Sequence, residues 1–169
     1  LLGLYAETLA AWRGQAPVIF EPLAHEGLKA AYAQTFGQPM LPGYLLEQAD
    51  LIVSFGADFL ETWLSPVEYS RKFKAMHALK EGRKGLFIHV GPYQSLTAAN
   101  ADQWLACRPG SEAFVALGLI QALLNQGAGK ELPVPFRSAL NQLSDGFGPA
   151  EVARQTDLAE ADFQKLLYR

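Results

Sequence analysis

The eight residues LIVSFGAD at positions 51–58 decide the fold class of this chain. Residues 51–55 are apolar or small, are rich in β-branched and aromatic side chains, and stop abruptly at Gly56. Such a run, ended by a glycine, is typical of a short strand that is buried on both faces of a sheet. We therefore predict a strand over residues 51–55 that is followed at once by a tight turn.

The same pattern occurs twice more. Residues 86–90 form a second apolar run that ends at Gly91, and residues 17–20 form a third that ends at Glu21. Helix-length segments separate these runs, which favours parallel pairing through crossover connections. The sequence therefore predicts an α/β fold, a Rossmann-like three-layer domain with a mostly parallel sheet and helices on both faces. In such a fold the strand-ending turns share the carboxyl edge of the sheet, where open α/β domains bind their ligands.

Apolar periodicity and turn residues predict the remaining elements. A further strand is expected at residues 103–107. Helices are expected at residues 4–12, 26–36, 66–79, 112–126, 136–143, 149–155 and 159–168, with a helical turn within 44–49. Asp157 is placed to cap the last helix. We expect an α/β nucleotide-binding-like domain over residues 1–130 and a C-terminal helical extension, residues 131–169, that packs on the same domain.

Composition narrows the function classes. The 169 residues are half hydrophobic and carry a net charge of only -3, with scattered basic residues, so the sequence offers no electrostatic footprint for nucleic acid. No run reaches the roughly 18 apolar residues of a membrane span. The single cysteine, Cys107, excludes an internal disulfide and is interpreted as a packing residue. The chain begins Leu1-Leu2-Gly3 without a methionine, and we interpret it as a piece of a longer protein.

Two strand-ending turns and one carboxylate are the candidate binding residues. Gly56 and Gly91 let the backbone approach a ligand without a Cβ atom, and backbone amides near helix starts favour phosphate. The alternative is that each glycine merely ends a strand. Glu112 offers a carboxylate that accepts from two N–H or O–H donors of a base or sugar, unless it only compensates a helix dipole.

Other chemistry lacks its residues. The three histidines, His25, His77 and His89, have no metal-ligand spacing, and His89 is expected to be buried and hydrogen-bonded within its strand. The glycine fingerprint of dinucleotide folds, the Walker loop and the hydrolase serine elbow are all missing from the sequence. The sequence therefore predicts no catalytic constellation within this chain.

Three spaced segments resemble the molybdopterin oxidoreductase (dimethyl sulfoxide reductase) family. They are residues 49–58, residues 91–105 and the Arg-Pro-Gly-Ser-Glu segment at 108–112. The family has a strand ending in a glycine turn, a proline-bearing turn with a Thr-Ala and Ala-Asp segment, and a Pro-Gly-Thr-Asp helix start. The resemblance spans most of residues 45–126, and residues 148–153 match weakly. Residues 55–67 look most like the large subunit of alternative complex III and of related quinone-linked complexes.

This resemblance implies a domain that grips one guanine dinucleotide of a bis-molybdopterin guanine dinucleotide cofactor. The implied cofactor-binding residues are Gly56 and Asp58 in the first turn, Gly91, Pro92 and Ser95 in the second, and Gly110 and Glu112 at the helix start. It also implies a place in a respiratory electron-transfer complex on the periplasmic side of a bacterial membrane. The implied partners are the remainder of the same polypeptide, iron–sulfur subunits and membrane subunits.

Two alternatives to cofactor binding stay open, the first because of three substitutions. Tyr93 stands where the family typically has arginine, Glu112 where it has aspartate, and Asp58 where asparagine is common. These changes fit a degenerate, cofactor-free scaffold domain, because an added carboxylate beside a pyrophosphate is unfavourable. The second alternative is the central domain of thiamine-diphosphate enzymes, which explains residues 49–56 but not residues 101–112. The sequence leaves open whether the complete protein is an enzyme.

Overall fold

The structure is a computed structural model that describes residues 2–12, 25–79 and 82–168. The chain divides into two compact units, residues 1–44 and residues 45–169. In the first unit, helix α1 spans Leu2–Ala11 and helix α2 spans Glu26–Phe36. Gly37 ends α2 in a left-handed conformation, and the bounds of α2 are those predicted. The strand predicted at residues 17–20 and its exit turn lie outside the described residues.

The second unit is built on a three-stranded sheet. Strands β1 (Leu51–Phe55), β2 (Leu86–Gly91) and β3 (Gln103–Ala106) lie in the order β1-β2-β3, and both pairings are parallel. This confirms the predicted parallel arrangement. Phe55 is opposite Val90, and Gly91 is opposite Ala106. All three strands therefore end at the same edge of the sheet.

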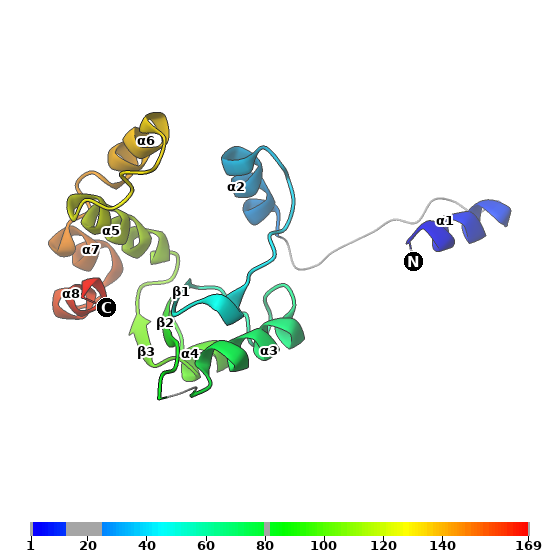
Figure 1. Ribbon diagram of the computed structural model, residues 1–169, viewed down its shortest axis with the longest axis horizontal. Helices are drawn as coiled ribbons and strands as arrows, with labels where there is room; N and C mark the ends of the chain where they lie inside the picture. Colours follow the sequence, from blue (N-terminus) through cyan, green and yellow to red (C-terminus); the bar gives the residue numbers. More distant parts are fainter. Residues whose placement is uncertain (1, 13–24, 80–81, 169) are drawn as a thin grey trace. The chain divides into compact units, whose positions relative to one another are not determined.

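Helices cover both faces of the sheet, so the predicted α/β fold is confirmed (Figure 1). Helix α3 (Pro66–His77) lies on one face, where the ring of Phe87 packs edge-on against Phe73 at a centroid distance of 5.3 Å. The next residue of β2, Ile88, belongs to the core on the other face, because successive strand residues point to opposite sides. Helix α5 (Glu112–Asn125) covers that face and contributes Val115 to the core.

The remaining helices complete the second unit. They are the 3-10 turn η1 (Leu46–Gln48) and the α-helices α4 (Leu96–Ala99), α6 (Val134–Ser144), α7 (Pro149–Thr156) and α8 (Glu160–Leu167). Helix α4 was not predicted, because four residues are too few to show a helical period. The predicted cap by Asp157 is wrong. Asp157 ends α7 in a left-handed conformation and pairs with Arg108, and Ala159 precedes α8 without a side-chain cap.

Val152 of α7 and Phe163 of α8 are fully buried against α5 and join the same core as Cys107. The role of Cys107 as a packing residue is thus confirmed. Burial also raises the pKa of its thiol, because a thiolate is poorly solvated among apolar side chains. The C-terminal helices therefore bury part of the same hydrophobic core that covers the sheet.

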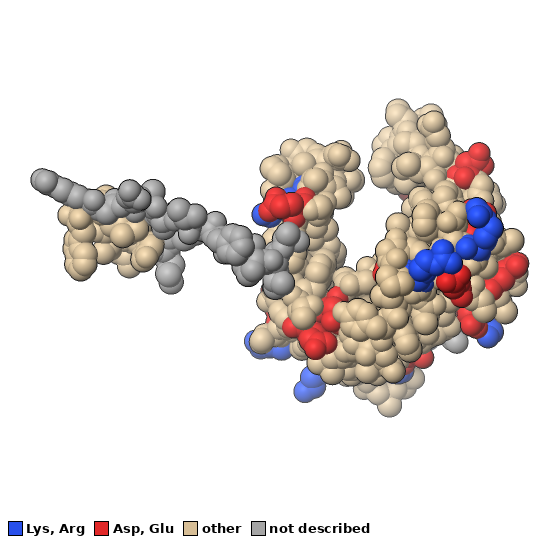
Figure 2. Space-filling view, turned by 180° about the vertical axis from the view of Figure 1, so that it is seen from behind, with Lys and Arg blue, Asp and Glu red and all other residues tan. Residues whose placement is uncertain are grey.

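Charged side chains of both signs stand beside one another on the face shown in Figure 2. Exposed ion pairs form within single helices of the second unit, such as Arg154 with Glu151 and Lys165 with Asp162. Exposed pairs of this kind contribute little to stability. Among the described residues, no helix has the length and apolar character that crossing a membrane requires.

Asp102 anchors the opposite, amino-terminal edge of the sheet. Its carboxylate accepts hydrogen bonds from the backbone N–H of Phe87 at 2.9 Å and from the Lys84 ammonium, and it lies 2.9 Å from Nε2 of His77. Burial alone raises the pKa of Asp102, but these hydrogen bonds outweigh it and lower the pKa from 3.8 to about 2. The carboxylate therefore stabilises the fold in its ionised form.

We expect this pKa shift to make part of the stability acid-sensitive. Because the folded-state pKa of Asp102 is depressed, its contribution is present above about pH 4 and is lost as the pH falls toward 2. The loss is at most about 2 kcal/mol, at 1.36 kcal/mol per pKa unit, because solvent screens part of the interaction of a residue at the surface. Urea unfolding of Asp102→Asn should show a shallower loss of stability over that pH range than the unchanged protein. Asp162→Asn, which removes an exposed carboxylate, is the control and should follow the unchanged protein.

Candidate functional site at the carboxyl edge of the sheet

The turn after β1 brings Gly56 to the carboxyl edge of the sheet. Gly56 has φ +63°, a left-handed conformation that glycine adopts without strain. Its N–H donates to the carbonyl of Val90 at 2.8 Å, so the turn is held to the end of β2. A Cβ built on Gly56 would lie 3.7 Å from Oε1 of Glu112. Backbone conformation, rather than lack of space, therefore favours glycine here.

Glu112 is the first residue of α5, and its side chain reaches the turn that follows β1. Its side chain is half-buried, and its carboxylate lies beside Gly56. The structure thus brings together two of the predicted residues, Gly56 and Glu112, that lie far apart in the sequence. A carboxylate at a helix start is favourable electrostatically and can accept two hydrogen bonds from one ligand.

Asp58 is held in the same turn. Its carbonyl accepts hydrogen bonds from the N–H groups of Glu61, Thr62 and Trp63 at 2.9–3.1 Å. The side chain is only 7% exposed, and its Oδ1 has no hydrogen-bond partner among the described residues. A buried polar atom without a partner costs about 1–3 kcal/mol, so such atoms are rare in folded proteins. Asp58 therefore has an unused acceptor at this edge.

Two hydrogen bonds tie the turn around Asp58 to α4. The N–H of Leu60 donates to Oγ1 of Thr97 at 3.0 Å, and the N–H of Leu96 donates to the Glu61 carboxylate at 3.2 Å. Thr97 is fully buried. The loop that carries Asp58 is thus fixed by the Thr97 side chain and the Leu96 backbone N–H, which both belong to the segment between β2 and β3.

His89 of β2 is the residue that sequence reasoning missed. It is buried as expected, at 3% exposed, but its Nδ1 has no hydrogen-bond partner among the described residues. Burial lowers the pKa of His89, and the carboxylates of Asp58 and Glu112 oppose that effect. His89 therefore lies within electrostatic reach of both carboxylates, one following β1 and one starting α5. The lack of metal-ligand spacing in the sequence gave no reason to select it.

The other predicted residues have mixed surroundings. Gly91 ends β2, and its carbonyl accepts from the indole Nε1 of Trp104 at 3.0 Å. Ser95 is buried and caps α4, because its Oγ accepts from the N–H of Ala98 at 3.2 Å. Pro92 is half-buried, whereas Gly110 has open space around its Cα and φ +79°. The structure brings Gly56 and Glu112 together and sets Gly91 against His89. The carboxylates of Asp58 and Glu112 both act electrostatically on that histidine.

The cluster does not have the form of a metal site. Among the residues that the structure describes, no group of three His, Cys, Asp or Glu side chains is arranged to hold a metal ion. Its chemistry is instead that of hydrogen bonding, with two carboxylates that accept and an imidazole that either accepts or donates.

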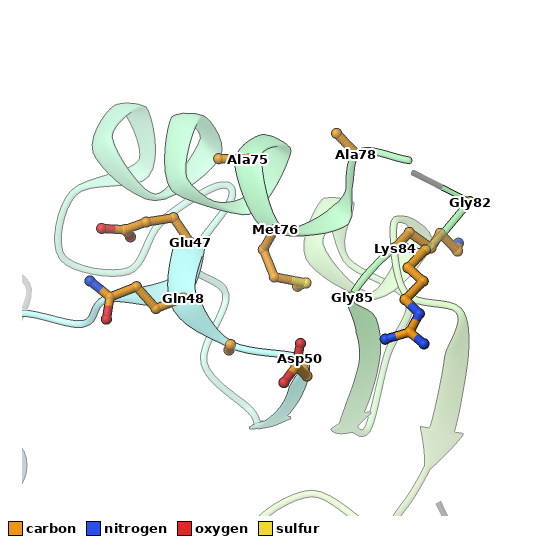
Figure 3. A pocket seen from close by; sticks show the side chains of 11 residues that line it. Glu47, Gln48, Asp50, Ala75, Met76, Ala78, Gly82, Lys84 and Gly85 are labelled. Carbon is orange, nitrogen blue, oxygen red and sulfur yellow. The ribbon is translucent and has the colours of Figure 1, made fainter. Parts of the chain in front are cut away.

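A separate groove of about 590 Å³ lies at the amino edge of the sheet (Figure 3). Met76 points from α3 toward Gly85, before β2, and Asp50 lies before β1. A Cβ on Gly85 would lie 2.0 Å from Sδ of Met76, so a larger residue there would force the Met76 side chain to move. Lys84 at this groove already binds Asp102. We therefore place the candidate binding site at the carboxyl edge.

Curated proteins resemble this chain over its greater part, although no family model matches it. A menaquinone reductase molybdopterin-binding-like subunit from Nitratidesulfovibrio vulgaris is 36% identical over 114 residues, which are 68% of this chain and 16% of that protein. A nitrate reductase from Shewanella frigidimarina is 33% identical over 99 residues, 57% of this chain and 10% of that protein. A respiratory nitrate reductase subunit alpha from Haloferax mediterranei is 30% identical over 93 residues, 54% of this chain and 9% of that protein. The chain is a relative of the molybdopterin oxidoreductases.

A solved structure agrees with this relationship. Acetylene hydratase from Pelobacter acetylenicus superimposes with a TM-score of 0.56 at 25% sequence identity, over 72% of this chain and 16% of that chain. The chain thus spans about a sixth or less of the length of these molybdopterin oxidoreductase relatives. It corresponds to one segment of a subunit of this kind.

Proposed function

We propose that this segment holds the guanine end of a molybdopterin guanine dinucleotide cofactor at the carboxyl edge of its sheet. The observation that carries the proposal is the position of the Glu112 carboxylate beside the Gly56 turn. Guanine presents two neighbouring N–H donors on one edge, and a carboxylate accepts from both at once. The cofactor, when bound, supplies the redox chemistry, and the residues of this chain bind and orient it.

The residues around Glu112 are also suited to binding the guanine part of the ligand. Asp58 and His89 each carry a buried polar atom without a partner among the described residues, and a ligand would satisfy both. The turn at Gly56 has no side chain to shield the Glu112 carboxylate. Pro92, Ser95 and Gly110 stay proposed cofactor-binding residues, with Ser95 acting through the cap of α4.

A cofactor-free scaffold is the second candidate function. Tyr93 follows Pro92 where the family typically has arginine, and its side chain is 61% exposed. With Asp58 and Glu112 close by, the edge carries two carboxylates where a pyrophosphate would bring further negative charge. In this role the segment would support neighbouring redox subunits. The relatives found do not favour the thiamine-diphosphate alternative.

The setting of the complete protein is also part of the proposal. One relative is named a menaquinone reductase subunit and another a respiratory nitrate reductase subunit. We infer that the protein carrying this segment belongs to a respiratory electron-transfer complex on the periplasmic side of a bacterial membrane. Its partners would be the remainder of its own polypeptide together with iron–sulfur and membrane subunits.

Base discrimination tests the guanine site. Calorimetric titration should show saturable binding of guanosine and weaker binding of inosine, which lacks the exocyclic amine. Glu112→Gln should weaken guanosine about 10- to 100-fold and remove the preference over inosine, because hydrogen bonds to a charged group contribute about 1.5–3 kcal/mol.

Glu160→Gln is the matched control for this titration. Glu160 is also the first residue of a helix, α8, but it is exposed and belongs to another part of the fold. Both substitutions remove one carboxylate from a helix start, so only the Glu112 variant should change nucleoside binding. Equal affinity for guanosine and inosine in the unchanged protein would contradict the proposed site.

A chemical assay separates the cofactor-holding role from the scaffold role. Acid hydrolysis of the protein purified from its native host should release a stoichiometric amount of GMP if the dinucleotide is bound. Chromatography without a GMP peak, alongside a positive control from a nitrate reductase, would support the cofactor-free scaffold instead.

A further inference from the structure

His89 is a buried histidine whose ring lies across the end of its own strand. A Cβ built on Gly91 would lie 2.8 Å from Nε2 of His89, so any larger residue there would force the imidazole to move. The ring is almost fully buried, and its Nδ1 has no hydrogen-bond partner among the described residues. A buried imidazole with an unused nitrogen, set beside a ligand-binding edge, is available to gain a proton or a ligand contact.

The charged groups that act on His89 are both carboxylates. Asp58 follows β1 and Glu112 begins α5. The cross-strand neighbours of His89 are Ser54 on β1 and Trp104 on β3, which carry no charge. Ser54 donates its hydroxyl to the carbonyl of Ala57, and Trp104 donates its indole N–H to Gly91. Protonated His89 would therefore face two negative groups.

A nucleotide phosphate at this edge needs a positive charge. The residue after Pro92 is Tyr93, a neutral phenol, and Arg108 directs its guanidinium to Asp157 at 2.6 and 3.1 Å. Two carboxylates without a cation would repel a pyrophosphate. Protonation of His89 would supply a positive charge at the end of β2, and a phosphate would help to offset the cost of charging a buried ring.

We propose that a phosphate-bearing nucleotide binds this edge together with a proton on His89. The affinity for nucleotide phosphates then rises as the pH falls, whereas the affinity for the matching nucleoside does not. This inference rests on the proposed guanine site and adds that the affinity of the site for a phosphate-bearing ligand depends on pH. Linkage makes the effect reciprocal, because a ligand that prefers the protonated site must also raise its proton affinity.

The sign of the pH dependence follows from the neutral state of the free site. Burial lowers the pKa of His89, so the free protein holds the imidazole neutral at neutral pH. Each ligand molecule that binds then takes up one proton. Above the pKa of the free site, the affinity should fall by up to about tenfold for each pH unit.

Calorimetric titration with guanosine and GDP from about pH 5.5 to about pH 8 tests the proposal, since histidine titrates in this range. In the unchanged protein, the ratio of GDP affinity to guanosine affinity should rise as the pH falls. His89→Gln should make this ratio depend only on the ionisation of GDP itself, which is the same for every variant. His25→Gln, which changes a histidine in the other unit, should behave like the unchanged protein.

A second measurement needs no variant. Titration of GDP in buffers with different ionisation enthalpies counts the protons exchanged, and we expect an uptake close to one proton. If guanosine binds and GDP also binds but takes up no proton, this inference is overturned and the guanine site is left intact. GDP and guanosine that both fail to bind at every pH would overturn the guanine site, and this inference with it.

Discussion

Replacing Phe87 by alanine is expected to lower the free energy of unfolding by about 3–5 kcal/mol, the usual cost of deleting a buried aromatic ring. Phe87 is fully buried in the central strand. Its ring packs edge-on against Phe59 and Phe73, each at a centroid distance of 5.3 Å. The cavity would lie between the sheet and α3, where the strand backbone cannot collapse to fill it.

Urea unfolding followed by circular dichroism measures this change. The midpoint should fall without a change in the slope, because the surface exposed on unfolding stays similar. Phe136→Ala is the control, since Phe136 of α6 is 45% exposed and should lose little stability. Equal effects of the two substitutions would mean that the packing of Phe87 against Phe59 and Phe73 does not stabilise this face of the sheet.

Gly118→Val is expected to have the second large effect, a loss of at least about 2 kcal/mol from overpacking. Gly118 is buried in α5. A Cβ at this position would lie 2.5 Å from Cγ2 of Val152, 2.8 Å from Cζ of Phe163 and 3.2 Å from the carbonyl oxygen of Phe147. The carbonyl is backbone and the two side chains are fully buried, so none of the three can move freely. Helices α7 and α8 would have to shift away from α5.

The control for this substitution is Gly27→Val in α2. Gly27 is also helical, but a Cβ there would meet no atom within 4 Å. Both substitutions add the same atoms to a helix, so their difference isolates the clash. Thermal unfolding should show a lower Tm only for the Gly118 variant. A stable Gly118→Val protein would show that α7 and α8 dock on α5 less tightly than the distances indicate.

Most of the second unit's secondary structure was predictable because its signals are local. The strand over Leu51–Phe55 was predicted with its observed bounds, and the predicted helix beginning at Glu112 differs from α5 by one residue at its end. Glycine and proline mark most of the remaining ends. Asp157 shows the limit of this reasoning. A carboxylate shortly before a helix suggests a cap, but the ion pair with Arg108, 49 residues away, holds it elsewhere.

The candidate site was predictable only in part. Gly56, Gly91 and Glu112 could be selected because each follows a turn signal or begins a helix. His89 could not, because its sequence context is an ordinary apolar strand and its missing hydrogen bond is a property of its neighbours. Whether a buried polar atom finds a partner depends on the packing of several elements, which no local pattern encodes.

The sequence by itself determined that this chain has short parallel strands ended by glycine turns and separated by helices, because backbone preferences and apolar periodicity are local properties. Only the tertiary structure decided that the carboxylates of Asp58 and Glu112 both act on His89 at one edge of the sheet. This arrangement depends on the strand register that aligns the ends of β1 and β2 and on the docking of α5 over the sheet. Register and docking arise from burial of side chains far apart in the chain, so the electrostatics of this edge exist only in the folded protein.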